Sequence, residues 1–257
     1  NYGMTSFADL FTDRQLVALT TFSDLVAETR ERVLADASAA DLPGGPGLSE
    51  ASPGDAATAS SYADAVATYL AFGVSKAASR NCTLAIWEAG MDRLAGALGR
   101  QALPMTWDYA ETNPVAGAGG DIAGTVWSVS EVLDKLDGPV VGTVEQRDAA
   151  ATAHLGWPVI STDPPYYDNI GYADLSDFFY VWLRGCLKSI HPNVFSTLLT
   201  PKHQELIASP YRFDGGKREA ETFFETGLAE AFRRVRAGAR SDYPLTVYYG
   251  YKQSEAA

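Results

Sequence analysis

The chain has 257 residues, 46% of them hydrophobic and 20% charged, which is enough for one large core or two small ones. Its 32 acidic and 20 basic residues give a formal net charge of −12, which repels nucleic-acid phosphates unless the cations are clustered. No apolar run approaches the roughly 20 residues of a membrane span and no signal-peptide pattern opens the chain, so we expect a cytoplasmic protein with no membrane partner. The cysteines and histidines lack the spacing of a disulfide framework or a metal site.

The first predicted elements are a long helix and a loop. Thr12–Gln15 is typical of a helix N-cap, and an apolar stripe over residues 16–33 predicts a helix that continues to about Ala37. Residues 39–60 are rich in Gly, Pro, Ser and Asp and predict a flexible loop.

More helix is expected after this loop. Residues 62–78 predict a second helix with Tyr69 and Phe72 on its buried side. Residues 80–110 are expected to form short helices or an irregular helical cap. We therefore expect residues 1–110 to be a mainly helical N-terminal part.

A glycine-rich segment, residues 113–120, precedes a predicted helix over residues 122–136. Gly117 and Gly119 would allow the backbone to approach a ligand closely. The segment departs from the dinucleotide motif because Ile122 stands at its last glycine position, and it lacks the lysine of a phosphate loop. A surface turn is favoured over a cofactor loop.

Strands and helices alternate in the second half of the chain. Strands are predicted over residues 140–144, over an apolar run at 157–162 and over residues 244–250. Helices are predicted over residues 174–190 and 216–237. This alternation favours an α/β fold with a parallel sheet.

A stiff motif, Asp163-Pro164-Pro165-Tyr166, follows the apolar run directly. Proline ends a strand and restricts the residue before it, so the carboxylate and the ring flank a rigid turn. In open α/β sheets, ligands bind at the carboxyl ends of the strands. The plainer alternative is a proline-rich loop with an incidental Asp and a surface Tyr.

This tetrapeptide resembles the D-P-P-Y signature of amino-group DNA methyltransferases that act on N6 of adenine. The whole chain resembles large bacterial adenine-specific DNA methylases, which are related to a domain of unknown function and in some members to a zinc ribbon. Four further segments carry the resemblance: Phe11–Leu16, Gly99–Met105, Leu199–Lys202 and Gly215–Lys217. It implies an incomplete Rossmann-like core over residues 111–257, S-adenosylmethionine as cofactor, DNA as partner and a place in restriction–modification or phage defence.

The resemblance also implies site residues. An adenine amine is a poor nucleophile because its lone pair is delocalised, and Asp163 and the Pro164 carbonyl can accept its two hydrogens. Tyr166 offers a stacking face for a flipped base. The expected cofactor contacts are Asp148 and Asp163. The expected catalytic residues are Asp163, Pro164, Pro165 and Tyr166, and the expected substrate contacts are Tyr166, Tyr167, Asn169 and Tyr172, with Tyr180 a further candidate for base contact.

Several alternatives to a complete DNA adenine methyltransferase stay open. The family's glycine-rich cofactor loop has no good match, so we expect it before residue 1, in a missing N-terminal part of the same protein. Methylation of RNA or of a protein amide is less favoured because those enzymes typically carry Asn in place of Asp163. A non-catalytic DNA-binding or scaffold module is the third reading. Basic residues after the motif, from Lys202 to Arg240, could face DNA, but a solvated helix end is favoured.

Overall fold

A computed structural model describes residues 3–52, 54–99, 106–117, 119–136, 142–151, 159–168 and 170–250. The chain forms two compact units, each built from two segments. The helical unit comprises Asn1–Gly142 and Leu175–Thr200, and the motif unit comprises Thr143–Asp174 and Pro201–Ala257. These divisions do not coincide with the boundary expected at residue 110. No helix within the described ranges is long and apolar enough to cross a bilayer.

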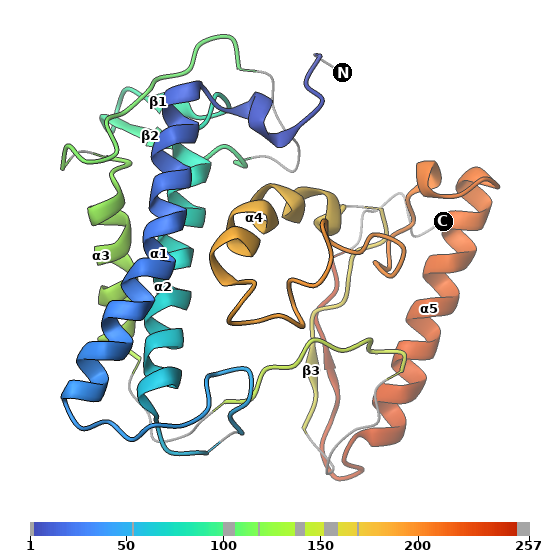
Figure 1. Cartoon of the computed structure of the whole chain (residues 1–257). Helices are drawn as coiled ribbons and strands as arrows, with labels where there is room; N and C mark the ends of the chain where they lie inside the picture. The colour runs from blue at the N-terminus through green and yellow to red at the C-terminus, as the bar shows by residue number, and fades with distance from the viewer. Residues whose placement is uncertain are drawn as a thin grey trace. The chain divides into compact units, whose positions relative to one another are not determined.

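Two long helices, α1 (Asp13–Ala39) and α2 (Ala59–Arg80), lie side by side in the helical unit (Figure 1), after a short 3-10 helix η1 (Phe7–Leu10). Both helices begin with a capping box, in which a side chain at the N-cap and one three residues later bond each other's backbone N–H groups. At α1, Thr12 accepts from the Gln15 N–H, and the Gln15 amide oxygen lies 2.9 Å from the Thr12 nitrogen. Both predicted helices are confirmed, and α2 starts earlier and ends later than expected.

Small side chains form the buried face of α2, and they recur at helical spacing as Ala63, Ala67, Ala71, Val74 and Ala78. Tyr69 and Phe72 are 38% and 46% exposed, so the prediction that they are buried is wrong. Small residues allow α1 and α2 to approach closely. The aromatic rings instead pack edge-on against each other, with centroids 6.1 Å apart.

A short hairpin follows α2. Strand β1 (Ile86–Glu88) pairs antiparallel with β2 (Arg93–Ala95), and Asp92 in the turn has a left-handed backbone with φ +52°. The expectation of short helices over residues 80–110 is therefore wrong for this part. The reason is a cross-strand pair, Trp87 opposite Leu94, in which Leu94 is 1% exposed and anchors the hairpin in the core.

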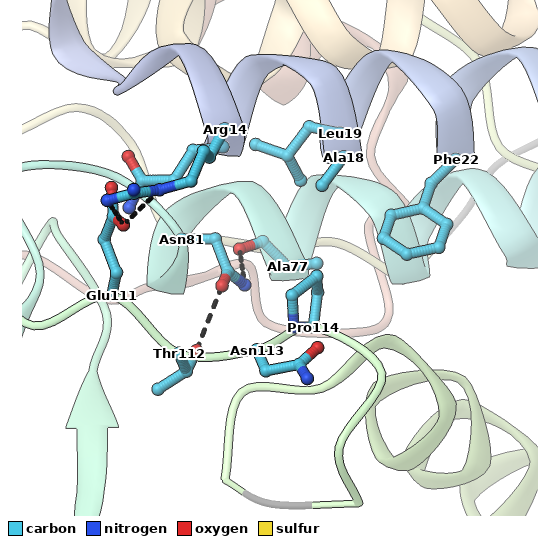
Figure 2. A pocket seen from close by; sticks show the side chains of 11 residues that line it. Arg14, Ala18, Leu19, Phe22, Ala77, Asn81, Glu111, Thr112, Asn113 and Pro114 are labelled. Carbon is cyan, nitrogen blue, oxygen red and sulfur yellow. Dashed lines mark hydrogen bonds and ion pairs between the residues drawn. The ribbon is translucent and has the colours of Figure 1, made fainter.

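The glycine-rich segment packs against the helical unit and leads into α3 (Ile122–Leu133), which ends three residues earlier than predicted. The amide of Asn81, at the end of α2, donates to the Gly120 carbonyl and accepts from the Thr112 hydroxyl, the second contact being drawn in Figure 2. Gly120 has φ +105°, and a Cβ there would lie 3.2 Å from Thr112 Oγ1. Asp121 caps α3 by accepting from the Gly124 N–H. The segment is therefore a packed structural turn.

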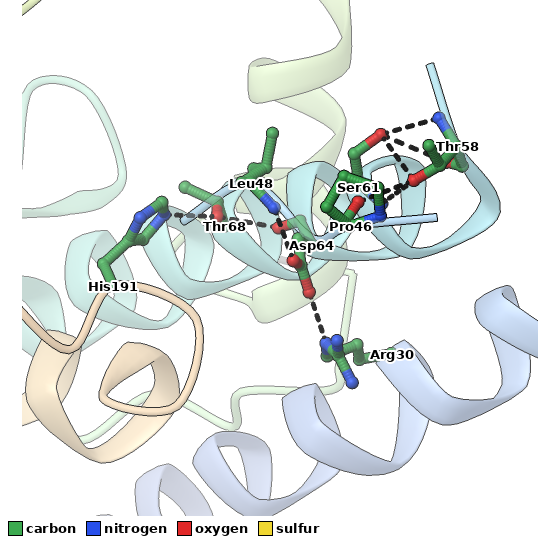
Figure 3. Close-up of polar contacts among 8 residues, drawn as sticks. All are labelled: Arg30, Pro46, Leu48, Thr58, Ser61, Asp64, Thr68 and His191. Atoms are coloured by element: carbon green, nitrogen blue, oxygen red, sulfur yellow. Dashed lines mark hydrogen bonds and ion pairs between the residues drawn. The ribbon is translucent and has the colours of Figure 1, made fainter. Parts of the chain in front are cut away.

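Asp64 on α2 holds the loop between α1 and α2 in place (Figure 3). Its buried carboxylate pairs with Arg30 Nε of α1 at 2.5 Å and accepts from the Leu48 N–H at 2.9 Å. The Thr68 hydroxyl donates to the Asp64 carbonyl and lies 3.2 Å from His191 Nε2. The loop has the predicted position, and the Asp64 carboxylate connects it to both helices, beside backbone hydrogen bonds at the helix ends such as Ala59 N–H to the Pro43 carbonyl.

Helix α4 (Tyr172–Leu187) supplies aromatic residues to the core of the helical unit. The Phe11 ring stacks on Phe178 and meets Trp182 edge-on, with centroid distances of 5.9 and 5.3 Å. Tyr180 is 8% exposed, and its hydroxyl donates to the Thr197 carbonyl at 2.8 Å. The predicted base contact by Tyr180 is therefore wrong because its ring and hydroxyl are both used in packing.

The motif unit contains β3 (Ser161–Thr162), the 3-10 helix η2 (Pro210–Arg212), α5 (Gly216–Gly238) and β4 (Thr246–Val247). Strands β3 and β4 pair in parallel, and both lie in segments that the sequence predicts to be strands. The strand expected over 140–144 is absent from its described part, since residues 142–144 are irregular and Val144 is 97% exposed. The sheets in the described ranges have two strands each, so a Rossmann-like core stays a prediction.

Candidate functional site

The D-P-P-Y motif begins directly after β3. The Thr246 N–H donates to the Ile160 carbonyl at 3.1 Å, and the Tyr248 N–H donates to the Thr162 carbonyl at 2.8 Å. Thr162 is thus fixed on its strand, and the next residue, Asp163, is exposed at the carboxyl end of β3. This is the position that the sequence predicted for the motif.

Asp163 and Tyr166 contact each other across the two prolines. The Tyr166 hydroxyl donates to Asp163 Oδ1. This hydrogen bond, together with burial and the carboxylate charge, raises the pKa of Tyr166. The hydroxyl therefore stays protonated at neutral pH and acts as a donor to the carboxylate.

Two further tyrosines lie near the Tyr166 ring. Tyr249, just after β4, meets it edge-on with centroids 5.3 Å apart and an interplanar angle of 77°. Tyr172, the first residue of α4, is 56% exposed and also contributes electrostatically to the raised pKa of Tyr166. A Cβ at Gly250 would lie 3.4 Å from Tyr166 Cε2, so the backbone packs along the ring there. The three tyrosines 166, 172 and 249 form what we call the tyrosine cluster.

Tyr167 turns towards α5. Its backbone has φ +43°, in the left-handed region that is uncommon for residues other than glycine. Its ring lies 5.3 Å from Phe224, and its hydroxyl donates to Glu221 at 2.8 Å. Burial and this hydrogen bond raise the pKa of Tyr167 to about 12. These contacts favour a supporting role over the expected contact with a substrate.

Arg212 connects three chain segments next to the tyrosine cluster through ion pairs and a hydrogen bond. Its Nη2 atom lies 2.7 Å from Asp174 Oδ2 and 2.8 Å from Glu205 Oε2, and Nη1 donates to the Lys202 carbonyl. Glu205 also accepts from the Ala173 N–H, so the network fixes the first turn of α4 beside Tyr172. This role of Arg212 was not predicted, because in the sequence Arg212 is one of several cations after the motif.

The remaining expected contacts are Asp148, Asn169 and the glycine-rich segment. Asp148 lies in an exposed turn, where its carboxylate accepts from the Ala150 N–H at 2.8 Å. Residues 142–147 before it are irregular, so the expected strand end is missing there. Asn169 lies outside the described residues. The glycine-rich segment, whose Gly120 is bonded to Asn81, belongs to the helical unit. The expected cofactor contacts of Asp148 and Asp163 therefore stay predictions.

Carboxylates pair with many of the cations that follow the motif. Arg233 and Arg234 pair with Glu230, and Arg240 pairs with Asp242. Lys217 lies 3.6 Å from Glu221. These pairs neutralise part of the positive charge on and after α5, which favours the interpretation as a solvated helix end. Within the described ranges, no three His, Cys, Asp or Glu side chains gather as a metal site would require.

The chain matches no model of a protein family, no curated protein and no solved structure. Any functional assignment therefore depends on the motif and on the chemistry of the side chains around it.

Proposed function

We propose that this chain carries the adenine-holding half of an S-adenosylmethionine-dependent methyltransferase that modifies N6 of adenine in DNA, in the cytoplasm, on a Rossmann-like α/β core. The observation that supports the proposal best is the hydrogen bond from the Tyr166 hydroxyl to the Asp163 carboxylate at the end of β3. It brings a hydrogen-bond acceptor and a stacking surface together on one rigid turn.

Asp163 would hold the amine. The lone pair of an adenine amine is delocalised into the ring, and accepting its hydrogens favours the pyramidal nitrogen that can act as a nucleophile. Asp163 offers one acceptor and the Pro164 carbonyl offers the second. Because Asp163 is exposed, an incoming amine can replace the Tyr166 hydroxyl at Oδ1 without unfolding the turn.

Tyr166 would stack on the target base. A base within a duplex is out of reach of such a turn, so it must be extruded, and aromatic faces stabilise extruded bases. Within the tyrosine cluster, Tyr249 supports the Tyr166 ring from its edge, and Tyr172 is 56% exposed, whereas Tyr180 is buried.

The cofactor supplies the methyl group when it is bound. Its cradle would come from residues other than the described ones, and of this chain we propose contact with it for Asp148 and Asp163 only. Tyr167 and Arg212 would support the loop without touching the base.

A scaffold role is the second candidate, and the paired cations favour it. One experiment separates the candidates: the complete natural protein is incubated with methyl-labelled S-adenosylmethionine and, separately, with double-stranded DNA, single-stranded DNA, RNA and protein. We expect N6-methyladenine in DNA, detected by mass spectrometry of the digested nucleosides. Label in RNA or protein would point to the other methyltransferases, and no label in any arm would favour the scaffold.

The 257-residue chain should bind S-adenosylmethionine weakly or not at all by itself. The reason is that the motif would supply only one wall of the site, and the glycine-rich turn that accommodates such a cofactor has no good match in the sequence. Isothermal titration calorimetry measures this directly. Binding with a low-micromolar dissociation constant would contradict the prediction, and repeating the titration with Gly117→Val and Gly119→Val variants would show whether the glycine-rich segment is responsible.

Substitutions at Tyr166 should separate the ring from the hydroxyl. Tyr166→Phe removes the hydrogen bond to Asp163 but keeps the stacking face, and should retain most of the activity. Tyr166→Ala should weaken productive binding of the base by about ten- to a hundredfold, because stacking contributes about 1–3 kcal/mol. Turnover and melting temperature of both variants in the complete protein are the measurements. A stable but inactive Tyr166→Phe protein would refute the stacking role, since it would place the chemistry on the hydroxyl.

A further inference from the structure

The helical unit contains a pocket of about 300 Å³ between η1, α1 and α4. That volume is at the small end of the range for small-molecule sites, which is about 300–1,000 Å³. All of its described lining belongs to the helical unit, so the inference below does not depend on the proposed function. The lining includes three aromatic residues, Phe7, Phe11 and Trp182, and three polar residues, Thr20, Ser23 and Asp24.

Two aromatic rings of the lining meet at nearly a right angle. The centroids of the Phe11 and Trp182 rings lie 5.3 Å apart, with 79° between the ring planes. Phe178 stacks on Phe11 with centroids 5.9 Å apart, so packing in the core holds the Phe11 ring in place. Phe7, on η1, is a partly buried third ring. The faces of aromatic rings attract organic cations, and rings set at an angle can surround an alkylated ammonium group.

Asp24 gives this aromatic pocket a negative charge. It is exposed and lines the pocket, and the described lining contains no Lys, Arg or His. In the described part of the chain no cation pairs with Asp24: on α4, Arg184 Nε donates to the Thr197 carbonyl, and Lys188 is exposed. Glu28, one turn further along α1, adds to the negative charge. The pocket therefore favours a ligand that is both apolar and positively charged.

The other polar side chains of the lining do not oppose a cation. The Thr20 hydroxyl donates to a backbone carbonyl of its own helix at 2.7 Å, so its oxygen remains as an acceptor. Ser23 Oγ lies 3.2 Å from Cys186 Sγ. Burial raises the pKa of the Cys186 thiol, the Ser23 hydrogen bond lowers it and the charge of Asp24 raises it, so the thiol is neutral at neutral pH. The indole N–H of Trp182 is a donor without charge.

We propose that this pocket binds a small organic cation with an alkylated ammonium group, such as the trimethylammonium head of choline. The methyl groups lie against the aromatic rings, and Asp24 balances the charge from the exposed side. A quaternary ammonium group has no N–H, so it needs no hydrogen-bond acceptor in the apolar part of the pocket. An inorganic divalent cation is disfavoured because Asp24 is the single carboxylate of the described lining. An anion is disfavoured because it would find no positive partner there.

Two probes of the same shape test the charge. Choline carries a cationic nitrogen, and neohexanol has a carbon atom in its place. With the 257-residue chain, we expect choline to bind with a dissociation constant on the order of 1 mM, about tenfold more tightly than neohexanol. Titrations followed by chemical-shift changes give both constants, and nuclear Overhauser contacts from the N-methyl protons to the Trp182 indole locate the probe. Equal affinities, no choline binding at tenfold the expected constant, or contacts elsewhere would overturn the proposal.

A matched pair of variants tests the partner of the charge. Asp24→Asn keeps the shape of the side chain and removes its charge. It should weaken choline binding by about threefold, as for an exposed charge pair, and leave neohexanol binding unchanged. Glu28→Gln removes the same charge one turn away, outside the described lining, and should change neither affinity. An unaltered affinity in Asp24→Asn would contradict the site. An equal loss in Glu28→Gln would do so too, since it would indicate a general attraction to the net charge of −12.

The trimethylammonium head occurs in free molecules and on lipids, and vesicles of phosphatidylcholine distinguish the two sources. Sedimentation of the native chain with the vesicles, lost in Asp24→Asn, would assign the pocket to the lipid head group. A chain that binds choline but stays in the supernatant would assign it to a free molecule.

Discussion

Replacement of Asp163 by alanine should lower the rate of methyl transfer to adenine by about a hundredfold or more in the complete protein, because a hydrogen bond made to the reacting group in the transition state is lost. The fold should stay intact. Asp163 is exposed, and the side-chain contact that the structure shows for it is the hydrogen bond from its neighbour Tyr166. Single-turnover methylation of a DNA duplex measures the effect without interference from product release.

The matched control is Asp214→Ala, which removes an exposed carboxylate from the same unit but outside the motif. It should leave the rate unchanged. Asp163→Asn adds information because an amide still offers a carbonyl acceptor but no charge, so its rate should fall between those of the native protein and Asp163→Ala. A folded Asp163→Ala protein with nearly native turnover would eliminate the proposed function.

Asp64→Ala should cost the helical unit about 3–5 kcal/mol of unfolding free energy, which is the usual effect of removing one partner of a buried ion pair. The carboxylate is 3% exposed and joins three chain segments through Arg30 and the Leu48 N–H. Arg30 retains 31% exposure of its side chain and can turn to water, which favours the lower end of this range. Urea unfolding followed by circular dichroism measures the loss.

The control for this change is Asp36→Ala, which removes an exposed carboxylate from α1. Surface substitutions of this kind usually change stability by less than about 0.5 kcal/mol. The stability of Asp64→Asn should lie between the stabilities of Asp64→Ala and Asp36→Ala, because its amide oxygen can still accept from the Leu48 N–H. An Asp64→Ala protein as stable as Asp36→Ala would show that the loop does not depend on the carboxylate.

The helices were predictable because their signals are local. Thr12 and Gln15 form a capping box within four residues, and α1 begins where that box predicts. The orientation of α2 was not predictable from hydrophobicity alone. Its alanines carry a weaker apolar signal than Tyr69 and Phe72, yet small side chains are what a close contact with α1 requires.

The part of the site that the sequence predicted is the D-P-P-Y turn, where rigid prolines separate two residues with functional side chains. The prolines place Asp163 beside Tyr166, and the sequence indicated this proximity. It could not indicate that Tyr167 points to α5, because Phe224, on which its ring packs, lies 57 positions further along the chain. The role of Arg212 was not predictable because its partner Asp174 lies 38 positions away in the sequence and the chain between them is largely irregular next to Glu205.

Because β4 follows β3 by so many residues, the β3–β4 pair can form only after the residues of the helical unit have been synthesised. Thr162 and its partner segment at Thr246 are separated by 84 positions, and closing so long a loop is slow. As the chain leaves the ribosome, the D-P-P-Y turn emerges with no strand beside it, while both segments of the helical unit are complete by Thr200. A message truncated before Thr246 would therefore yield a chain with all the residues of its helical core but with a turn that no neighbouring strand or Tyr249 ring holds in position.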